Sequence, residues 1–369
     1  MTQTKVCIGR AWLVCATLLA LSLLSACASG KASRDEGLTS APSVSVVAKP
    51  PSSSAATEDT QLSSQSPSEQ AEAVPDVYKL EPLSIASSQP TGRLQDSQLS
   101  EVSGLTASLA HAGLLYAIND SGNTPVLFAI DETGRLLHQW DIDARNRDWE
   151  DLTLMQLDGV SYVVIGDTGD NLRQHSSASL ILIEEPQWPP TQDQLSPAYT
   201  VQFTYEGGPS NVEAFSAIGD TVYLLSKEPV TALGALPNGV FELTLTKLTT
   251  QSASTDYIAR RIATMPTRTT GIESTLAATF AGVNLNHPTA LEFDASGSSA
   301  YVLTYREVLQ IARGRNQTWA EAFAAKANRL ESHSLKQAEA LTLYPGRAIW
   351  FTSESVGSPV RAISLAGPS

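Results

Sequence analysis

Cysteine is almost missing from this chain of 369 residues: there are three, Cys7, Cys15 and Cys27, all within the first 27 positions. The long remainder therefore has no disulfide and no cysteine metal site, and its fold depends on its own apolar core. Positive charge is also scarce, since 24 Lys and Arg stand against 38 Asp and Glu, a formal net charge of −14. No basic stripe offsets this balance, which argues against nucleic acid and anionic lipid surfaces as partners of the globular part.

Several well-known catalytic motifs are missing as well. The sequence contains no HExxH, CxxC or GxSxG pattern and no glycine-rich phosphate loop. Nucleophilic serine hydrolysis in particular loses support, and any chemistry has to come from residues that the fold brings together.

The N-terminus has the pattern of an export signal. Lys5 and Arg10 precede an apolar stretch over residues 11–24 that is too short for a lasting membrane span. The stretch ends in Leu24–Cys27, which resembles the lipobox of bacterial lipoproteins. By that resemblance residues 1–26 are removed, Cys27 is lipidated, and Ala28 directs the protein to the outer membrane, facing the periplasm or the cell surface. An ordinary cleaved signal with an incidental cysteine is the alternative.

Two regions of different composition follow. Residues 27–76 are rich in Ser, Ala, Pro, Thr and Gln and lack apolar periodicity, so they cannot bury enough surface to offset chain entropy. We interpret them as a tether with a root-mean-square reach of about 40 Å. Residues 77–369 are long enough for a large all-β domain, and we expect a monomer held at the membrane by its lipid.

Internal repetition predicts the architecture. Five segments share a polar first residue and an apolar continuation, and each is followed by two more short apolar runs. Their first residues are Glu101, Glu150, Glu213, Thr289 and Glu339. Short β-branched and aromatic segments that recur with Gly, Asp and Asn between them predict the blades of a β-propeller.

The last repeat shows only three strand-like segments, whereas an extra one, Val77–Leu83, precedes the first repeat. We therefore expect circular closure by an N-terminal strand, which removes an exposed sheet edge. Five blades are predicted; six is the alternative, with a degenerate blade within Thr267–Asn286. One helix is expected over Thr318–Asn328, with Thr318 as its N-cap.

At these repeats the chain resembles a bacterial propeller family related to the phytase-esterase-like and SdiA-regulated groups. The resemblance is carried by Glu101–Leu105, Ile118–Gly122, Asp148–Leu152, Ile165–Asn171, Asn211–Phe215 and Gln337–Leu341. It implies the propeller fold and, because relatives with known chemistry commonly hold calcium in the central channel, a calcium cofactor. It implies no particular activity, since propellers host unrelated functions.

Overlaying the repeats places mostly charged residues at two equivalent positions beside strands that would line the channel. The first position holds the five residues that begin the repeats, and the second holds Asp120, Asp167, Lys227, Arg306 and Glu354. Acids in a ring need a cation, a proton or basic partners. The candidate metal ligands are therefore Glu101, Asp120, Glu150, Asp167, Glu213, Glu339 and Glu354. The alternative is structural: such acids can join neighbouring blades through backbone N–H groups.

Other residues of these loops are candidate ligand-binding residues. Asp167, Asp170 and Asn171 offer oxygen ligands in a Gly-containing turn, although Asp and Asn are also ordinary turn residues. The candidate ligand-binding set is Asn119, Asp170, Asn171, Lys227 and Arg306. His175 and His287 are candidate general bases, with surface loop histidines as the simpler interpretation. Trp140, Trp149 and Tyr305 are expected to pack between blades.

Two functions fit these observations. The first is an envelope lipoprotein whose propeller binds a protein, glycan or small molecule at an acidic, calcium-holding channel mouth. The second is a calcium-dependent hydrolase of a phosphate ester or lactone, in which the metal polarises an oxygen or activates water. The second requires a basic face opposite the metal, for which the sequence offers only Lys227 and Arg306.

Overall fold

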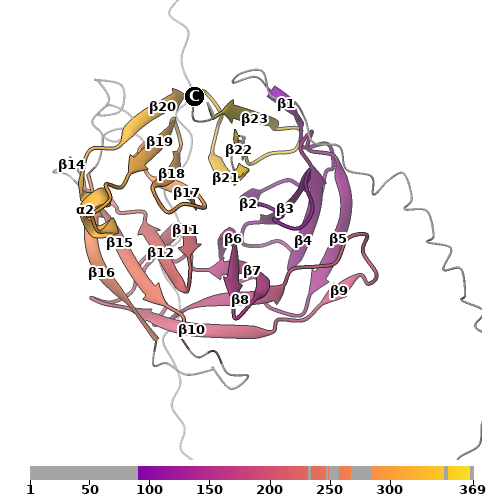
Figure 1. Ribbon diagram of the computed structural model, residues 1–369, viewed down its shortest axis with the longest axis horizontal. Helices are drawn as coiled ribbons and strands as arrows, with labels where there is room; N and C mark the ends of the chain where they lie inside the picture. Colours follow the sequence, from indigo (N-terminus) through magenta and orange to yellow (C-terminus); the bar gives the residue numbers. More distant parts are fainter. Residues whose placement is uncertain are drawn as a thin grey trace, which may run out of the picture. The chain divides into compact units, whose positions relative to one another are not determined.

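Short alternating segments of β-branched and aromatic residues form the strands of the computed structural model, which describes residues 90–231, 234–246, 248, 257–266, 284–344 and 348–365. The strands form antiparallel sheets that radiate from one axis (Figure 1). The first strand of each sequence repeat lies nearest the axis, and the next two strands of the repeat follow outward from it. This arrangement is a β-propeller, as predicted.

The described residues form five blades. Blade 1 contains β2 (Val102–Ala107), β3 (Leu114–Asn119), β4 (Val126–Asp131) and β5 (Leu136–Ile142), with the short β9 (Gln194–Leu195) at its outer edge. Blade 2 contains β6 (Trp149–Leu157), β7 (Val160–Asp167), β8 (Ala178–Glu184) and β10 (Tyr199–Tyr205). Blade 3 contains β11 (Val212–Ile218), β12 (Thr221–Ser226), β15 (Asn238–Thr244) and β16 (Tyr257–Met265). Blade 4 contains β17 (Pro288–Phe293), β18 (Ser299–Thr304), β19 (Glu307–Ala312) and β20 (Asn328–Ser332).

Blade 5 is completed by the N-terminal strand of the described chain. It contains β21 (Ala338–Tyr344), β22 (Ala348–Ser353), β23 (Pro359–Ser364) and β1 (Pro90–Arg93). Closure by an N-terminal strand is confirmed, but the strand that pairs with β23 is β1, whereas the predicted Val77–Leu83 lies outside the described residues. The strand escaped prediction because its four residues are polar or small. Gly92 suits this place, since a Cβ there would overlap the backbone of Thr133 in blade 1.

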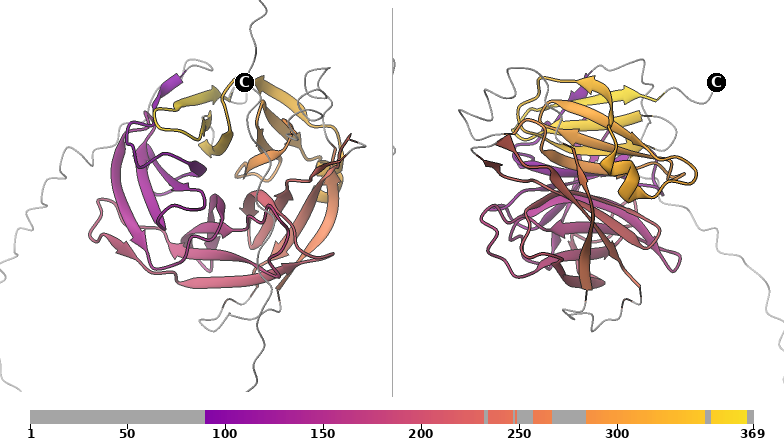
Figure 2. Two further views of the ribbon diagram at one scale, coloured as in Figure 1. Left: turned by 180° about the vertical axis from the view of Figure 1, so that it is seen from behind. Right: turned by 90° about the vertical axis from the view of Figure 1, so that its left-hand side faces the viewer.

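The inner strands settle the number of blades in the described ring. Strand β2 contacts β6, β6 contacts β11, β11 contacts β17, β17 contacts β21, and β21 returns to β2 (Figure 1). Figure 2 shows the same ring from behind. The circle closes with five blades; residues 267–283, most of the segment considered for a sixth, lie outside the described part.

The hydrophobic core lies in layers between neighbouring blades. Trp140 and Trp149 pack in the layer between blades 1 and 2, as predicted. Tyr305 lies outside these apolar layers, and its hydroxyl bridges Lys227 of blade 3 and Glu339 of blade 5 near the axis. Blades 2 and 3 are further joined by parallel pairing of β10 with β16.

The predicted helix is present as α2 (Trp319–Ala324), which is shorter than expected. The remaining described elements are β13 (Val230–Thr231) and β14 (Gly234–Ala235), which form a short hairpin. Thr318 is the N-cap of α2 and forms a capping box with Glu321. Trp319 and Phe323 pack between blades 3 and 4. Within the described residues, every helix falls short of the length and apolarity that a membrane span requires.

Candidate functional site: a cluster of carboxylates at the channel mouth

All five inner strands carry a β-bulge at the same place, near their first residue. A bulge adds one residue opposite a single partner and redirects its side chain. The bulged residues are Ser103, Glu150, Glu213, Thr289 and Glu339. The sequence overlay is therefore right for four repeats and wrong for the first, where Ser103 takes the place assigned to Glu101.

Glu101 lies two residues earlier, exposed, and its carboxylate accepts a hydrogen bond of 2.7 Å from Asn123. The error arises because Glu101 precedes the bulged residue by two positions, and in the sequence an acid just before a strand looks the same as an acid within it. Only the pairing of Val102 with Asn119, which matches that of Trp149 with Asp167, shows the true register.

The second overlay also differs from the structure in two repeats. Asp120, Lys227 and Glu354 each directly follow the second strand of a blade, and their N–H groups donate to the residue that precedes the inner strand. In blade 2 that place belongs to Thr168, because Asp167 is the last residue of β7. In blade 4 it belongs to Tyr305, with Arg306 one residue further on.

Three carboxylates converge where blades 1 and 2 meet at the axis. One oxygen atom each of Asp120, Asp148 and Glu150 lies within 4.8 Å of the other two. Asp148 belongs to one of the repeat segments, but the overlay of the repeats does not identify it as a ligand. It precedes the inner strand by one residue, and the only signal was its spacing of two from Glu150.

Three further acids approach this group from blades 3 and 5. The resulting channel-mouth cluster consists of Asp120, Asp148, Glu150, Glu213, Glu339 and Glu354. The predicted ligands Asp120, Glu150, Glu213, Glu339 and Glu354 are thus brought together.

The proton affinities of the cluster reflect burial and mutual repulsion. Burial raises the pKa of Asp120 to about 6, and nearby carboxylates add to the effect. Glu150 is 5% exposed, and burial followed by repulsion from Glu213 raises its pKa well above the ordinary value. Burial and the adjacent Glu354 raise the pKa of Glu339 to about 10. The mouth therefore holds more negative charge than it can stabilise alone.

One lysine partly balances the cluster. The ammonium of Lys227 lies 3.0 Å from Glu213 Oε2 and donates to the Tyr305 hydroxyl at 2.9 Å. That hydroxyl in turn donates to Glu339 Oε1 at 3.1 Å. Burial alone would lower the pKa of Lys227, but Glu213 and its other partners raise it above the ordinary value, so the lysine stays charged.

The three converging carboxylates fit a hard divalent cation. Calcium binds oxygen at about 2.3 to 2.6 Å, so oxygens on opposite sides of one ion lie roughly 5 Å apart. The 4.8 Å limit for Asp120, Asp148 and Glu150 meets that requirement. Gly169 contributes by lacking a side chain, since a Cβ there would overlap the carboxylates of both Glu150 and Asp148.

Several predicted residues lie outside the cluster and stabilise loops. Asp167 accepts from the Asp148 N–H at 2.8 Å, and Asp170 accepts from the backbone of His175 at 2.8 Å. The Asn171 side chain accepts from Asn211, and Asn119 donates to the Gln98 carbonyl at 2.6 Å. These contacts position the loops around the mouth.

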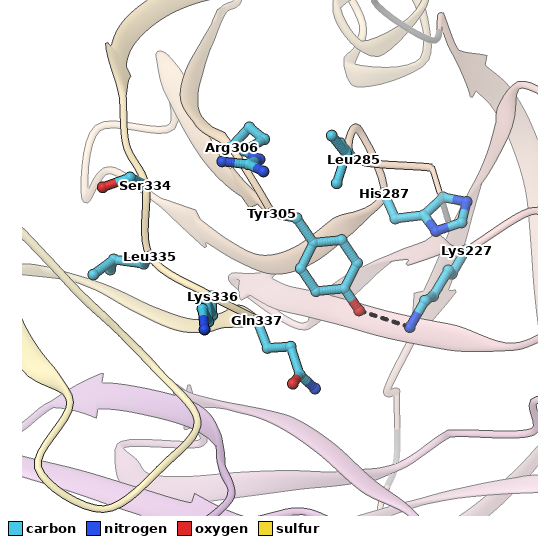
Figure 3. A pocket seen from close by; sticks show the side chains of 9 residues that line it. All are labelled: Lys227, Leu285, His287, Tyr305, Arg306, Ser334, Leu335, Lys336 and Gln337. Carbon is cyan, nitrogen blue, oxygen red and sulfur yellow. Dashed lines mark hydrogen bonds between the residues drawn. The ribbon is translucent and has the colours of Figure 1, made fainter. Parts of the chain in front are cut away.

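A cavity of about 610 Å³ adjoins the cluster between blades 3, 4 and 5. Lys227 and Tyr305 line both, so the two features meet at their hydrogen bond (Figure 3). Arg306 and His287, both singled out from the sequence, line the cavity, together with Lys336, which gave no signal in the sequence.

Fold and site together define a five-bladed β-propeller with an acidic channel mouth. No protein-family model matches the chain, and no curated protein sequence matches it. Among solved structures it is similar to an aldose sugar dehydrogenase from Streptomyces coelicolor in its PQQ-bound form, with 10% identity over 77% of this chain and 99% of that chain, at a TM-score of 0.40. It is also similar to a putative 6-phosphogluconolactonase from Bacteroides uniformis, with 12% identity over 72% of this chain and 67% of that one, at a TM-score of 0.33. At these scores neither likeness bears on activity, and the propeller assignment rests on the strand order and the closed ring of inner strands.

Proposed function

We propose that this protein is an envelope-anchored lipoprotein whose propeller binds a ligand at the channel mouth through a divalent cation, calcium. The observation that carries the proposal is the convergence of Asp120, Asp148 and Glu150 within the reach of one ion. When bound, the cation would supply positive charge and open coordination positions for an oxygen-bearing ligand.

Electrostatics support the cation. Two carboxylates about 5 Å apart repel by roughly 3 kcal/mol at an effective dielectric of about 20. The cluster has six carboxyl groups, and Lys227 lies against only one of them, Glu213. A proton can relieve Glu339, whose pKa is raised to about 10, whereas Asp120, whose pKa is raised only to about 6, keeps its negative charge at neutral pH.

The test is thermal unfolding of the purified protein with calcium and with excess chelator. At a calcium concentration about 100 times the Kd, binding stabilises the folded state by roughly 3 kcal/mol. Asp148→Asn should abolish most of that gain, while the matched variant Glu101→Gln, which changes an exposed acid outside the cluster, should keep it. An unchanged melting temperature in chelator, with no co-purifying metal, would rule out the cation.

The membrane anchor is supported by the sequence alone, since residues 1–89 lie outside the described part. The basic start, the short apolar stretch and Cys27 all fit a lipoprotein signal. Cys27→Ser should move the protein from the membrane fraction to the soluble periplasm while its melting temperature stays the same. Retention of this variant in the membrane fraction would contradict lipid anchoring.

A calcium-dependent hydrolase of a phosphate ester or lactone is the second candidate. The observation that favours it is the cavity beside the cluster, whose lining includes Lys227, Arg306 and Lys336 and so provides the basic face this chemistry requires. A bound cation would polarise the substrate oxygen. A screen of phosphoesters and lactones, each with calcium and with chelator, decides between binding and catalysis. If the protein is this hydrolase, turnover occurs only with calcium and disappears in Asp148→Asn.

A further inference from the structure

The cavity beside the cluster has a surplus of positive charge in its lining. Lys227 is neutralised by Glu213, but Arg306 and Lys336 are exposed, and neither forms an ion pair with any residue in the described part of the chain. Leu285 and Leu335 add apolar surface. A volume of about 610 Å³ is typical of a small-molecule site.

His287 also lines the cavity, and its imidazole carries a hydrogen-bond acceptor. The side chain is 5% exposed, and its Nε2 lies 2.7 Å from the backbone carbonyl oxygen of Glu228. A carbonyl oxygen can only accept, so Nε2 carries the proton. Burial also lowers the pKa of His287 to about 4, which keeps the ring neutral at physiological pH. The proton is therefore on Nε2, and Nδ1 presents a lone pair.

That lone pair has no donor among the described residues. A buried acceptor without a partner costs about 1 to 3 kcal/mol, so a ligand that brings a donor gains from making the bond. Figure 3 shows His287 beside Lys227 on one side of the cavity, with Ser334, Leu335 and Lys336 across from it. A ligand spanning the cavity would therefore contact the His287 imidazole on one side and Lys336 on the other.

We propose that this cavity binds a hydroxyl-bearing small organic anion, with its anionic group held by Arg306 and Lys336 and a hydroxyl donating to Nδ1 of His287. The proposal concerns a site next to the cation site and does not depend on the cation. Carboxylate and phosphate share the required charge, so the experiment includes one of each.

The test is calorimetric titration of the full mature protein with gluconate, glucose 6-phosphate and uncharged glucose, in calcium and in chelator. Both anions should bind in either condition, at least about tenfold more tightly than glucose. The double variant Arg306→Gln, Lys336→Gln should weaken both anions at least about tenfold. The matched double variant Arg315→Gln, Lys326→Gln removes the same charges from exposed positions outside the cavity and should leave affinity unchanged.

The role of His287 is tested by the preference for gluconate over hexanoate, which has the same number of carbons and no hydroxyl. His287→Gln retains a donor for the Glu228 carbonyl, but its acceptor, Oε1, lies one bond farther from the backbone than Nδ1 and does not occupy the same place. It should reduce that preference about fivefold or more while the melting temperature and the affinity for hexanoate hold. An unchanged preference refutes the assignment of Nδ1.

The two proposals fail in different ways. Absence of anion binding in both calcium and chelator overturns the anion site, even if calcium still stabilises the fold. Anion binding in chelator with no effect of calcium on stability upholds the anion site and removes the cation. Equal affinities of wild type and the Arg306, Lys336 double variant also overturn the anion site.

Discussion

Two groups of polar residues meet on the inner strands β6 and β11, a few residues apart, and differ in how their polar groups are satisfied. The channel-mouth cluster gathers six acids around one lysine. The inner polar network, made of Asp151, Thr153, Ser216 and Glu292, is linked by hydrogen bonds. The comparison shows that one repeated strand can join neighbouring blades at one level and concentrate charge at another.

The inner polar network joins blades 2, 3 and 4 near the axis. Asp151 Oδ2 accepts from the N–H groups of Phe215 and Leu291 at 3.0 and 3.3 Å, so one carboxyl holds two neighbouring inner strands. Thr153 and Ser216 share a hydrogen bond of 3.1 Å, and Ser216 donates to Glu292 at 2.8 Å. These bonds satisfy inward-facing N–H groups that have no strand partner. In this network Asp151 joins neighbouring blades through backbone N–H groups, the structural role that was the alternative for the ring of acids.

The largest expected effect comes from removing Asp151. Asp151→Ala leaves the N–H groups of Phe215, Leu291 and Leu152 without their acceptor in a buried place, and should lower the free energy of unfolding by about 3 to 5 kcal/mol. Urea denaturation in chelator measures the loss. Asp148→Ala, at the mouth, should not destabilise the protein under the same conditions. Equal losses for both variants would mean that the two groups do not differ in kind.

A smaller effect, with a distinct pH dependence, is expected at Glu292. Burial raises the pKa of this carboxyl from 4.5 to about 7. Between these values the unfolded state binds fewer protons at this carboxyl than the folded state does. The contribution of Glu292 to stability is therefore fully present below pH 4.5 and is lost as pH rises through 7. Glu292→Gln should remove that fall and be more stable than wild type above pH 7 by about 2 to 3 kcal/mol. Denaturant curves from pH 5 to 8 test it, with exposed Glu184→Gln as the control that should follow wild type.

At the mouth, neutralising one acid should have opposite consequences with and without calcium. In excess chelator at pH 8, Glu150→Gln should stabilise the fold by about 2 kcal/mol, because it removes a buried carboxyl repelled by Glu213 and Asp120. With calcium, wild type should gain more than the variant, since the variant lacks a ligand. Melting temperatures under both conditions decide the point. A variant less stable in chelator would show that Glu150 is satisfied without a cation.

The smallest expected effect concerns the close approach of Gly169. A Cβ at this position would overlap the carboxylates of Glu150 and Asp148 and turn them away from their shared point. Gly169→Ala should weaken calcium binding about tenfold, or about 1.4 kcal/mol. Gly314→Ala is the matched control, because a Cβ there makes only ordinary contacts with Gln317. Calcium titration followed by calorimetry compares the two, and equal affinities would exclude Gly169 from the site.

The sequence determined the repeating strand, and with it the propeller, because alternating apolar residues and recurrent turns state locally which face of each strand is buried. It also identified Glu150, Glu213, Thr289 and Glu339 as equivalent positions, because each begins a repeat. Thr318 was recognisable as an N-cap because it precedes an Ala-rich run. Only the tertiary structure decided the register that replaces Glu101 by Ser103, since a bulge is a property of paired backbones. It alone brought Asp148 to Asp120 and placed Lys336 and His287 on opposite sides of one cavity. These pairs come from different blades or loops, and their placement depends on how the ring closes, which no local pattern records.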